Sequence, residues 1–266
     1  MITRRTFTGG LAAGVATAGA TSFQAAARAD ETPEPHLGVP PARNVVLVHG
    51  AYADGSCWSD VIERLHAAGM NVTSVQNPLT SLADDVAATE RALALQDGPT
   101  ILAAHSWGGT VISQAGLAQN VTGLVYVAAR APDAGEDYTA LAAKFPTPPA
   151  NSEIVESGGF KQLTKRGFLR DFAGGVPRPR ALVLYAAQGR IASSLFPTST
   201  TTVAAWRHQP TWYAISSQDR TTDPGLQRFL AARMGARTIE LPTSHLSILT
   251  HPDAIAHLIL RAAHGG

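Results

Sequence analysis

One serine stands in surroundings that suit a nucleophile. Ser106 lies in the stretch ILAAHSWGGTVISQAG, between a short apolar run and a run with helical spacing. A tight strand-to-helix turn forces its central residue toward positive φ, and the residues two positions away must then be small. Ala104 and Gly108 meet this requirement, and Gly109 adds room. We therefore predict that Ser106 is a nucleophile, with a glycine-rich turn that binds phosphate or simply packs closely as the alternative.

A serine hydroxyl needs a base to activate it, and the base needs an orienting acid. In a strand–turn–helix site the acid and then the histidine follow the serine along the chain. Asp219 comes just after the apolar run TWYAISS, and His245 lies in the loop after RTIEL. We predict that Ser106, His245 and Asp219 form a triad for acyl transfer. Four other residues remain alternatives for the base or the acid: His251, Asp223, Asp133 and Glu136.

Acyl transfer also needs donors for the oxyanion of the tetrahedral intermediate. The amide of Trp107, directly after the predicted nucleophile, is one candidate, and the amide of Ala51, after the first predicted strand, is the other. Tyr52 and the Trp107 side chain are predicted to line the substrate pocket, with core packing as the alternative. His49 and His105 are interpreted as residues that shape the loops around the site.

An alternation of short apolar runs and amphipathic segments must position these residues. The apolar runs predict strands over 44–50, 71–75, 100–104, 121–129, 211–217 and 237–241. Helical spacing predicts helices over 58–70, 82–98, 110–120, 224–235 and 253–264. Strands that alternate with helices form right-handed crossovers, so we expect an α/β fold with about six mostly parallel strands. The predicted triad would then meet at the carboxyl edge of the sheet.

The alternation breaks down between about residues 130 and 206. The stretches KFPTPPA, FAGGVPRPR and PTSTTTV are rich in residues that interrupt helices and strands. We interpret this part as an insertion over the sheet. Within it, the run ALVLYAAQ (181–188) fits a strand or a helix equally well, since periodicity does not separate the two.

The first 29 residues differ in composition from the rest. Arg4 and Arg5 precede a weakly apolar stretch rich in Ala and Gly, and the segment 27–29 fits an A-x-A cleavage site. We interpret 1–29 as a twin-arginine export signal, with an ordinary Sec signal or a disordered N-terminus as alternatives. Residues 30–43 would form a flexible tail, residues 44–266 one folded domain, and the protein would be periplasmic or secreted.

Charge and composition exclude several classes of partner. The chain is 45% hydrophobic and 15% charged, which is typical of a globular protein rather than a disordered one. Without the predicted leader it carries 18 Lys and Arg against 20 Asp and Glu, with no basic block, so we expect neither nucleic acid nor a membrane as a partner. No zinc-protease or phosphate-loop signature occurs, and we expect no metal and no organic cofactor. Cys57, the only cysteine, is expected to be a buried apolar residue.

Taken together, these motifs resemble the α/β-hydrolase superfamily, and within it the small bacterial esterase-like group related to plant methyl esterases and hydroxynitrile lyases. The stretches VVLVHGAYADGSCW, AAHSWGGTVISQAG, LVYVAARAPDAGED and SHLSILTHPDAIAHLI carry the resemblance, which covers about residues 44–135 and 170–262. It implies the triad of Ser106, His245 and Asp219, a helical cap formed by the insertion, and a helix rather than a strand over 177–188.

We therefore predict a secreted serine carboxylesterase that acts on small neutral alkyl or aryl esters, as a monomer or a homodimer. A hydroxynitrile lyase-like or cofactor-free haloperoxidase-like activity on the same fold is one alternative. Plant lyases of the group carry a threonine at the position of Gly50 and a lysine at that of Leu246, and the missing lysine removes a cation that would stabilise cyanide. A binding protein with a decayed pocket is another alternative, although every triad position is filled.

Overall fold

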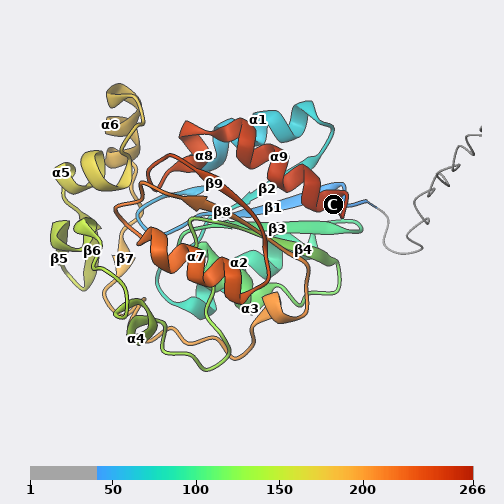
Figure 1. The fold of residues 1–266 in the computed structure, drawn as a ribbon, viewed down its shortest axis with the longest axis horizontal. Helices are drawn as coiled ribbons and strands as arrows, with labels where there is room; N and C mark the ends of the chain where they lie inside the picture. The colour runs from blue at the N-terminus through green and yellow to red at the C-terminus, as the bar shows by residue number, and fades with distance from the viewer. Residues whose placement is uncertain (1–40, 266) are drawn as a thin grey trace, which may run out of the picture. The chain divides into compact units, whose positions relative to one another are not determined.

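A computed structural model describes residues 41–265 of the protein (Figure 1). The predicted export signal at 1–29, and most of the predicted tail at 30–43, lie outside the described residues. Among the helices of residues 41–265, none combines the length and the apolar composition that a membrane span requires.

Six parallel strands form the main sheet, in the order β2-β1-β3-β4-β8-β9. Their bounds are β1 (Asn44–Val48), β2 (Asn71–Val75), β3 (Thr100–His105), β4 (Val121–Val127), β8 (Thr211–Ser216) and β9 (Arg237–Leu241). The inner strands are almost continuously apolar because helices cover both of their faces. Val46, Leu102 and Leu124 are neighbours across β1, β3 and β4, and none of them is exposed. The predicted α/β fold with a six-stranded parallel sheet is confirmed.

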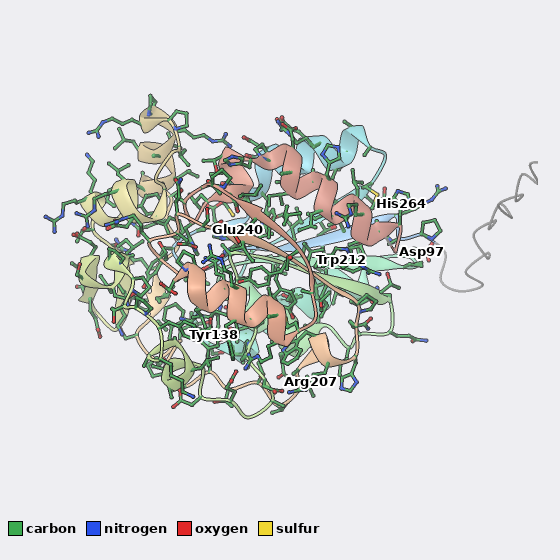
Figure 2. The ribbon with its side chains drawn as sticks, in the orientation of Figure 1. Asp97, Tyr138, Arg207, Trp212, Glu240 and His264 are labelled. Atoms are coloured by element: carbon green, nitrogen blue, oxygen red, sulfur yellow. The ribbon has the colours of Figure 1, made fainter. Side chains whose placement is uncertain are left out.

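Helices cover the two faces of this sheet (Figure 1). On one face α1 (Ser59–Ala67) packs against α9 (Pro252–Ala263), next to the short α8 (Ser247–Thr250). On the other face lie α2 (Leu82–Ala94), α3 (Gly108–Ala115) and α7 (Pro224–Arg233). Buried residues of α9 recur at helical spacing, as Ile255, Leu258 and Ile259 show, because one stripe of the helix faces the sheet. Figure 2 shows Trp212 of β8 inside the molecule, whereas Asp97 and His264 lie at its edge.

The insertion between β4 and β8 contains more than the predicted helices. Its helix α6 (Arg178–Ala186) confirms the helix expected over 177–188, and α4 (Tyr138–Ala142) and α5 (Lys165–Gly167) precede it. A small antiparallel sheet of β5 (Ile154–Ser157), β6 (Phe160–Leu163) and β7 (Ile191–Ala192) was not predicted. Four short turns of 3-10 or π helix complete the described elements: η1 (Gly55–Trp58), η2 (Pro149–Glu153), η3 (Phe168–Phe172) and η4 (Ala205–Arg207).

Candidate active site

Ser106 occupies the sharp turn between β3 and α3. Its φ is 53°, a conformation that a residue other than glycine seldom adopts and that marks a strained turn. A Cβ on Gly108 would lie 2.6 Å from the carbonyl oxygen of Val48, and a Cβ on Gly50 would lie 2.7 Å from the Cβ of Ser106. The small residues are therefore required by close approach of the backbone, as the sequence indicated. Helix α3 begins at Gly108, slightly earlier than the predicted start at residue 110.

The structure brings together the three residues that the sequence singled out. The Oγ of Ser106 lies 2.8 Å from Nε2 of His245, and Nδ1 of His245 lies 2.7 Å from Oδ2 of Asp219. The histidine is fully buried, and Ser106 is half-buried. The carboxylate can only accept, so Nδ1 carries the proton, and Nε2 is left to accept a proton from the serine hydroxyl.

Asp219 is held on both of its oxygens. Oδ1 accepts the amides of Thr221 and Thr222 at 2.7 and 3.0 Å, and Oδ2 also accepts Nε2 of Gln227 at 2.8 Å. Gln227 is itself fully buried, and its Oε1 accepts the amide of Ser216 at 2.9 Å. Charge-assisted hydrogen bonds of this kind stabilise an ionised carboxylate and fix its orientation. Sequence reasoning missed Gln227, since nothing but its place on the helix after Asp219 distinguishes it.

The alternative bases and acids have other partners. In the described part of the chain, none of the four has a hydrogen bond to Ser106 or His245. Their partners are Thr250 for His251, the amide of Leu226 for Asp223, Arg207 for Asp133, and Arg233 for Glu136.

The two amides predicted for the oxyanion lie beside the serine. Ala51 and Trp107 line the same cavity as Ser106, and within residues 41–265 neither of their N–H groups donates to a protein acceptor. Two such amides next to a nucleophile can donate hydrogen bonds that stabilise the negative charge developing on a carbonyl oxygen. Tyr52, predicted to line the pocket, does so, and its φ of 60° reflects the sharp bend of the loop that carries it.

Two neighbouring histidines shape this region. Nε2 of His49 accepts the amide of Asn77 at 2.9 Å, and its Nδ1 donates to the Gly50 carbonyl at 2.8 Å. His105 bonds through Nε2 to the carbonyl oxygen of His245, at 3.1 Å. Burial lowers the pKa of both His49 and His105, so both remain neutral. These contacts match the interpretation of both residues as loop-shaping groups.

Trp107 also depends on a carboxylate that the sequence did not reveal. Its indole Nε1 donates to Oδ2 of Asp85 at 2.7 Å, and Oδ1 of Asp85 accepts the amide of Leu79 at 2.8 Å. Asp85 has no exposed surface, and burial raises its pKa to about 6. This pair fixes the ring that adjoins the nucleophile.

Residues of the insertion close over the site. The cavity beside Ser106 has a volume of about 70 Å³, and its other wall includes Ile154, Leu163, Phe172 and Phe196. Small-molecule sites commonly occupy roughly 300–1,000 Å³. The cavity therefore suits a small acyl group.

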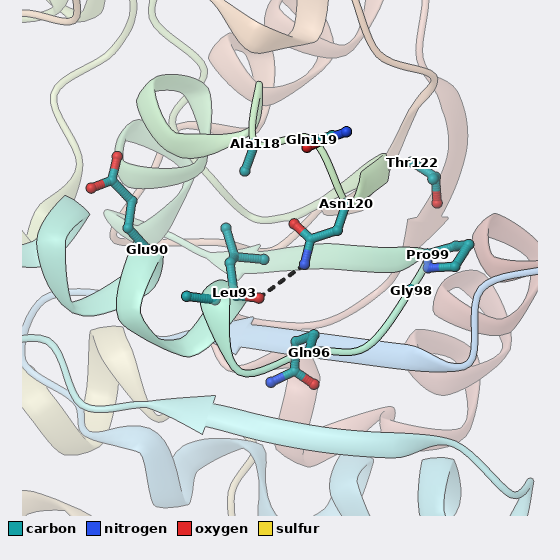
Figure 3. A pocket seen from close by; sticks show the side chains of 10 residues that line it. Glu90, Leu93, Gln96, Gly98, Pro99, Ala118, Gln119, Asn120 and Thr122 are labelled. Carbon is teal, nitrogen blue, oxygen red and sulfur yellow. Dashed lines mark hydrogen bonds between the residues drawn. The ribbon is translucent and has the colours of Figure 1, made fainter.

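A larger cavity lies at the opposite end of the sheet (Figure 3). Its volume is about 660 Å³, and its lining includes Glu90, Gly98, Pro99 and Asn120, which lie in α2 and next to the starts of β3 and β4. Glu90 is the only ionisable residue among those that line it, and the lining includes no serine, cysteine or histidine. Size alone would therefore point to the wrong end of the molecule, because the chemical groups converge at the smaller cavity.

No group of three or more His, Cys, Asp or Glu side chains in residues 41–265 is placed to hold a metal ion.

The six-stranded parallel sheet carries a hydrogen-bonded serine, histidine and aspartate at its carboxyl edge, and comparison with known proteins identifies the family. The Alpha/beta hydrolase family model matches residues 45–258, so the chain belongs to this family. A curated relative, the carbendazim hydrolyzing esterase of Nocardioides sp. (strain SG-4G), is 33% identical over 138 residues. That match covers 44% of this chain and 53% of the relative, so it spans about half of the relative's length.

Solved structures show the same fold. A pyrethroid hydrolase from Sphingobium faniae JZ-2 superimposes with a TM-score of 0.69 at 22% identity, over 84% of this chain and 98% of that one. The methylesterase MES16 from Arabidopsis also has a TM-score of 0.69, at 17% identity, over 84% of this chain and 99% of that one. The predicted α/β-hydrolase resemblance is therefore confirmed.

Proposed function

We propose that the protein is a serine carboxylesterase that hydrolyses small-molecule esters through an acyl-enzyme. One observation carries the proposal: an unbroken hydrogen-bond chain runs from Ser106 Oγ through His245 to Asp219, at 2.8 and 2.7 Å. Membership of the α/β hydrolase family and the similarity to an esterase support it. The predicted leader supports the further proposal that the enzyme acts outside the cytoplasm.

In the proposed mechanism, acylation of Ser106 comes first. Nε2 of His245 removes the hydroxyl proton as Oγ of Ser106 attacks the ester carbonyl. The carbonyl oxygen gains a negative charge, which the amides of Ala51 and Trp107 stabilise. Asp219 stabilises the imidazolium and keeps its ring in place. When the tetrahedral intermediate collapses, the proton on Nε2 passes to the leaving alkoxide and the alcohol departs.

Deacylation repeats the same steps with water. His245 removes a proton from a water molecule, whose oxygen attacks the acyl-enzyme carbonyl. Collapse of the second intermediate breaks the bond to Oγ and returns the proton to Ser106, so the acid is released and the enzyme is regenerated. Every step uses groups of this chain and water.

An active-site probe tests the proposal directly. A fluorophosphonate is expected to label the wild-type protein at Ser106, and the substitution Ser106→Ala is expected to abolish both labelling and ester hydrolysis. Ser56→Ala is the matched control, because Ser56 is exposed and lies outside the cavity. Full ester hydrolysis by Ser106→Ala would overturn the proposal. Cyanide release from mandelonitrile without any ester turnover would favour the lyase alternative instead.

A further inference from the structure

Arg130 places a positive charge in the wall of the catalytic cavity. It follows the end of β4, is half-buried, and lines the cavity together with Ser106. Its backbone amide donates to the carbonyl oxygen of Ser106 at 3.0 Å, so the two residues are held side by side. No role was predicted for Arg130 from the sequence.

Within residues 41–265 the guanidinium of Arg130 has no hydrogen-bond acceptor and no acidic partner. Its neighbours are aromatic: Cζ lies 3.9 Å from the ring centroid of Phe196, 4.9 Å from that of Tyr138 and 5.5 Å from that of Trp107. Ring faces stabilise a cation, but the N–H donors of a guanidinium lie in its plane and need acceptors there. By contrast, Arg233 stacks on aromatic rings and also bonds Glu136.

Tyr52 presents a second donor on the same wall. Its hydroxyl is buried, lacks a hydrogen-bond partner in the described part of the chain, and belongs to a residue that lines the cavity. Burial raises the pKa of Tyr52 to about 12, so the phenol remains a neutral donor. A buried donor without an acceptor is costly, and such groups call for an explanation.

We propose that Arg130, assisted by the Tyr52 hydroxyl, binds a carboxylate of the substrate. The inference rests on the proposed ester hydrolysis, and it makes the substrates short esters that also carry a free carboxylate, such as monoesters of small dicarboxylic acids. A guanidinium forms two parallel hydrogen bonds to a carboxylate, which fits both the charge and the missing acceptors. The small volume of the cavity limits the distance between the ester and the carboxylate. The sequence predicted neutral esters because the pocket was expected to be apolar. The positive charge of Arg130 in the cavity wall is the reason to propose charged esters instead.

Paired substrates test the proposal, because each pair differs only in charge. Monoethyl glutarate is compared with its amide, ethyl glutaramate, which places the charge on the acyl side. The pair 4-acetoxybutanoate and 4-acetoxybutanamide places it on the alcohol side. We expect the wild-type enzyme to prefer the carboxylate in at least one pair by on the order of 10-fold or more in kcat/KM.

Arg130→Gln is expected to reduce this preference by on the order of 10- to 100-fold, mainly through KM for the carboxylate substrate. Arg237→Gln is the matched control, since Arg237 also stacks on an aromatic ring, that of Trp212, but lies outside the cavity. The control is expected to keep the wild-type preference. A wild-type enzyme that prefers the amide in both pairs would overturn the proposal. So would an Arg130→Gln variant that loses activity equally on both members of a pair.

Binding separates this proposal from the proposed function. Calorimetry with monoethyl glutarate and 4-acetoxybutanoate on Ser106→Ala protein needs no turnover. Binding of either compound that is lost in the double variant Ser106→Ala/Arg130→Gln supports the carboxylate site even if no ester is hydrolysed. Ester hydrolysis without a preference for the charged substrates, and without such binding, would leave the esterase function standing and refute the carboxylate site.

Discussion

The two sides of the catalytic cavity differ in how their polar groups are satisfied. On the triad side, both ring nitrogens of His245 and both oxygens of Asp219 have partners within the protein. On the opposite side, Arg130 and Tyr52 offer donors that meet no acceptor in residues 41–265. The first network is complete once the chain folds, whereas the second is completed only by something that enters the cavity.

This difference predicts opposite responses to mutation. Removing a member of a complete buried network leaves its partner unsatisfied, which costs stability, activity or both. Removing a donor that has no acceptor leaves nothing unsatisfied, so the folded protein should tolerate the change. Substitutions on the two sides of the cavity therefore test this contrast.

The largest losses are expected for the triad itself. Asp219→Asn should lower kcat by about 10⁴-fold, because the amide favours the wrong tautomer of His245. His245→Gln removes the base and should cost at least as much. Steady-state kinetics on an ester that the wild type hydrolyses measures both, with circular dichroism as the control for folding. A loss below 10-fold in either well-folded variant would mean that the hydrogen-bond chain does not perform the chemistry.

A smaller loss of kcat is expected for Gln227, which bonds Asp219 but not His245 or Ser106. Gln227→Leu removes the donor to Asp219 and leaves the Ser216 amide without its acceptor, so kcat should fall by up to about 100-fold. The free energy of unfolding should fall by roughly 1–3 kcal/mol. Gln209→Leu is the matched control, since the side chain of Gln209 donates to the Val121 carbonyl, away from the site. A Gln227→Leu variant that is less stable but retains its kcat would show that Gln227 has a purely structural role.

Asp85 predicts a dependence of stability on pH. Burial raises its pKa from an ordinary 3.8 to about 6, so the folded state holds the proton more tightly than the unfolded state. The contribution of Asp85 to stability is therefore complete below pH 3.8 and is lost as the pH rises through 6. Between pH 4.5 and 7.5 this loss amounts to about 2 kcal/mol.

Urea denaturation of wild type and Asp85→Asn at both pH values measures this effect. The asparagine does not titrate, so the variant should gain about 2 kcal/mol relative to wild type between pH 4.5 and 7.5. It should also disturb the position of the Trp107 ring, because the asparagine has one acceptor oxygen for the two donors, the Trp107 indole and the Leu79 amide, that the two carboxylate oxygens accept. A stability difference that is independent of pH would contradict the raised pKa.

The smallest effect on stability is expected for Arg130. Arg130→Met removes a partly desolvated cation and keeps much of the apolar contact with Phe196, so the free energy of unfolding should change by no more than about 1 kcal/mol. The same denaturation experiment that detects the loss in Gln227→Leu measures it. A loss above about 2 kcal/mol would indicate that the aromatic stacking of Arg130 is structural.

Sequence reasoning reached the strands and the triad because both depend on local rules. Apolar runs mark buried parallel strands, and the turn at Ser106 requires small neighbours that can be read directly from the chain. The ends of parallel strands meet at one edge, which is enough to bring Asp219 and His245 to the serine.

The contacts that sequence reasoning missed depend on how distant segments pack. Asp85 meets Trp107 only because α2 lies against α3, and Gln227 meets Asp219 only because α7 returns over β8. Arg130 stands out because its guanidinium meets no acceptor within residues 41–265, and no sequence pattern reports that. The small sheet of the insertion did leave a signal, the pair Gly158 and Gly159 between β5 and β6, both with positive φ. Its strands are short and largely exposed, so the apolar alternation that usually accompanies such a turn is missing.

The position of the insertion has a consequence for how this enzyme could change over time. Ser106, Asp219 and His245 all follow strands that lie outside it, so its sequence can be exchanged without touching the reaction machinery. Arg130, in contrast, lies where the insertion begins, just after strand β4 of the main sheet. During evolution, the substrate shape and the substrate charge that the enzyme accepts can therefore change in separate steps. Grafting the insertion alone onto another scaffold would transfer the preference for substrate shape but not the preference for substrate charge.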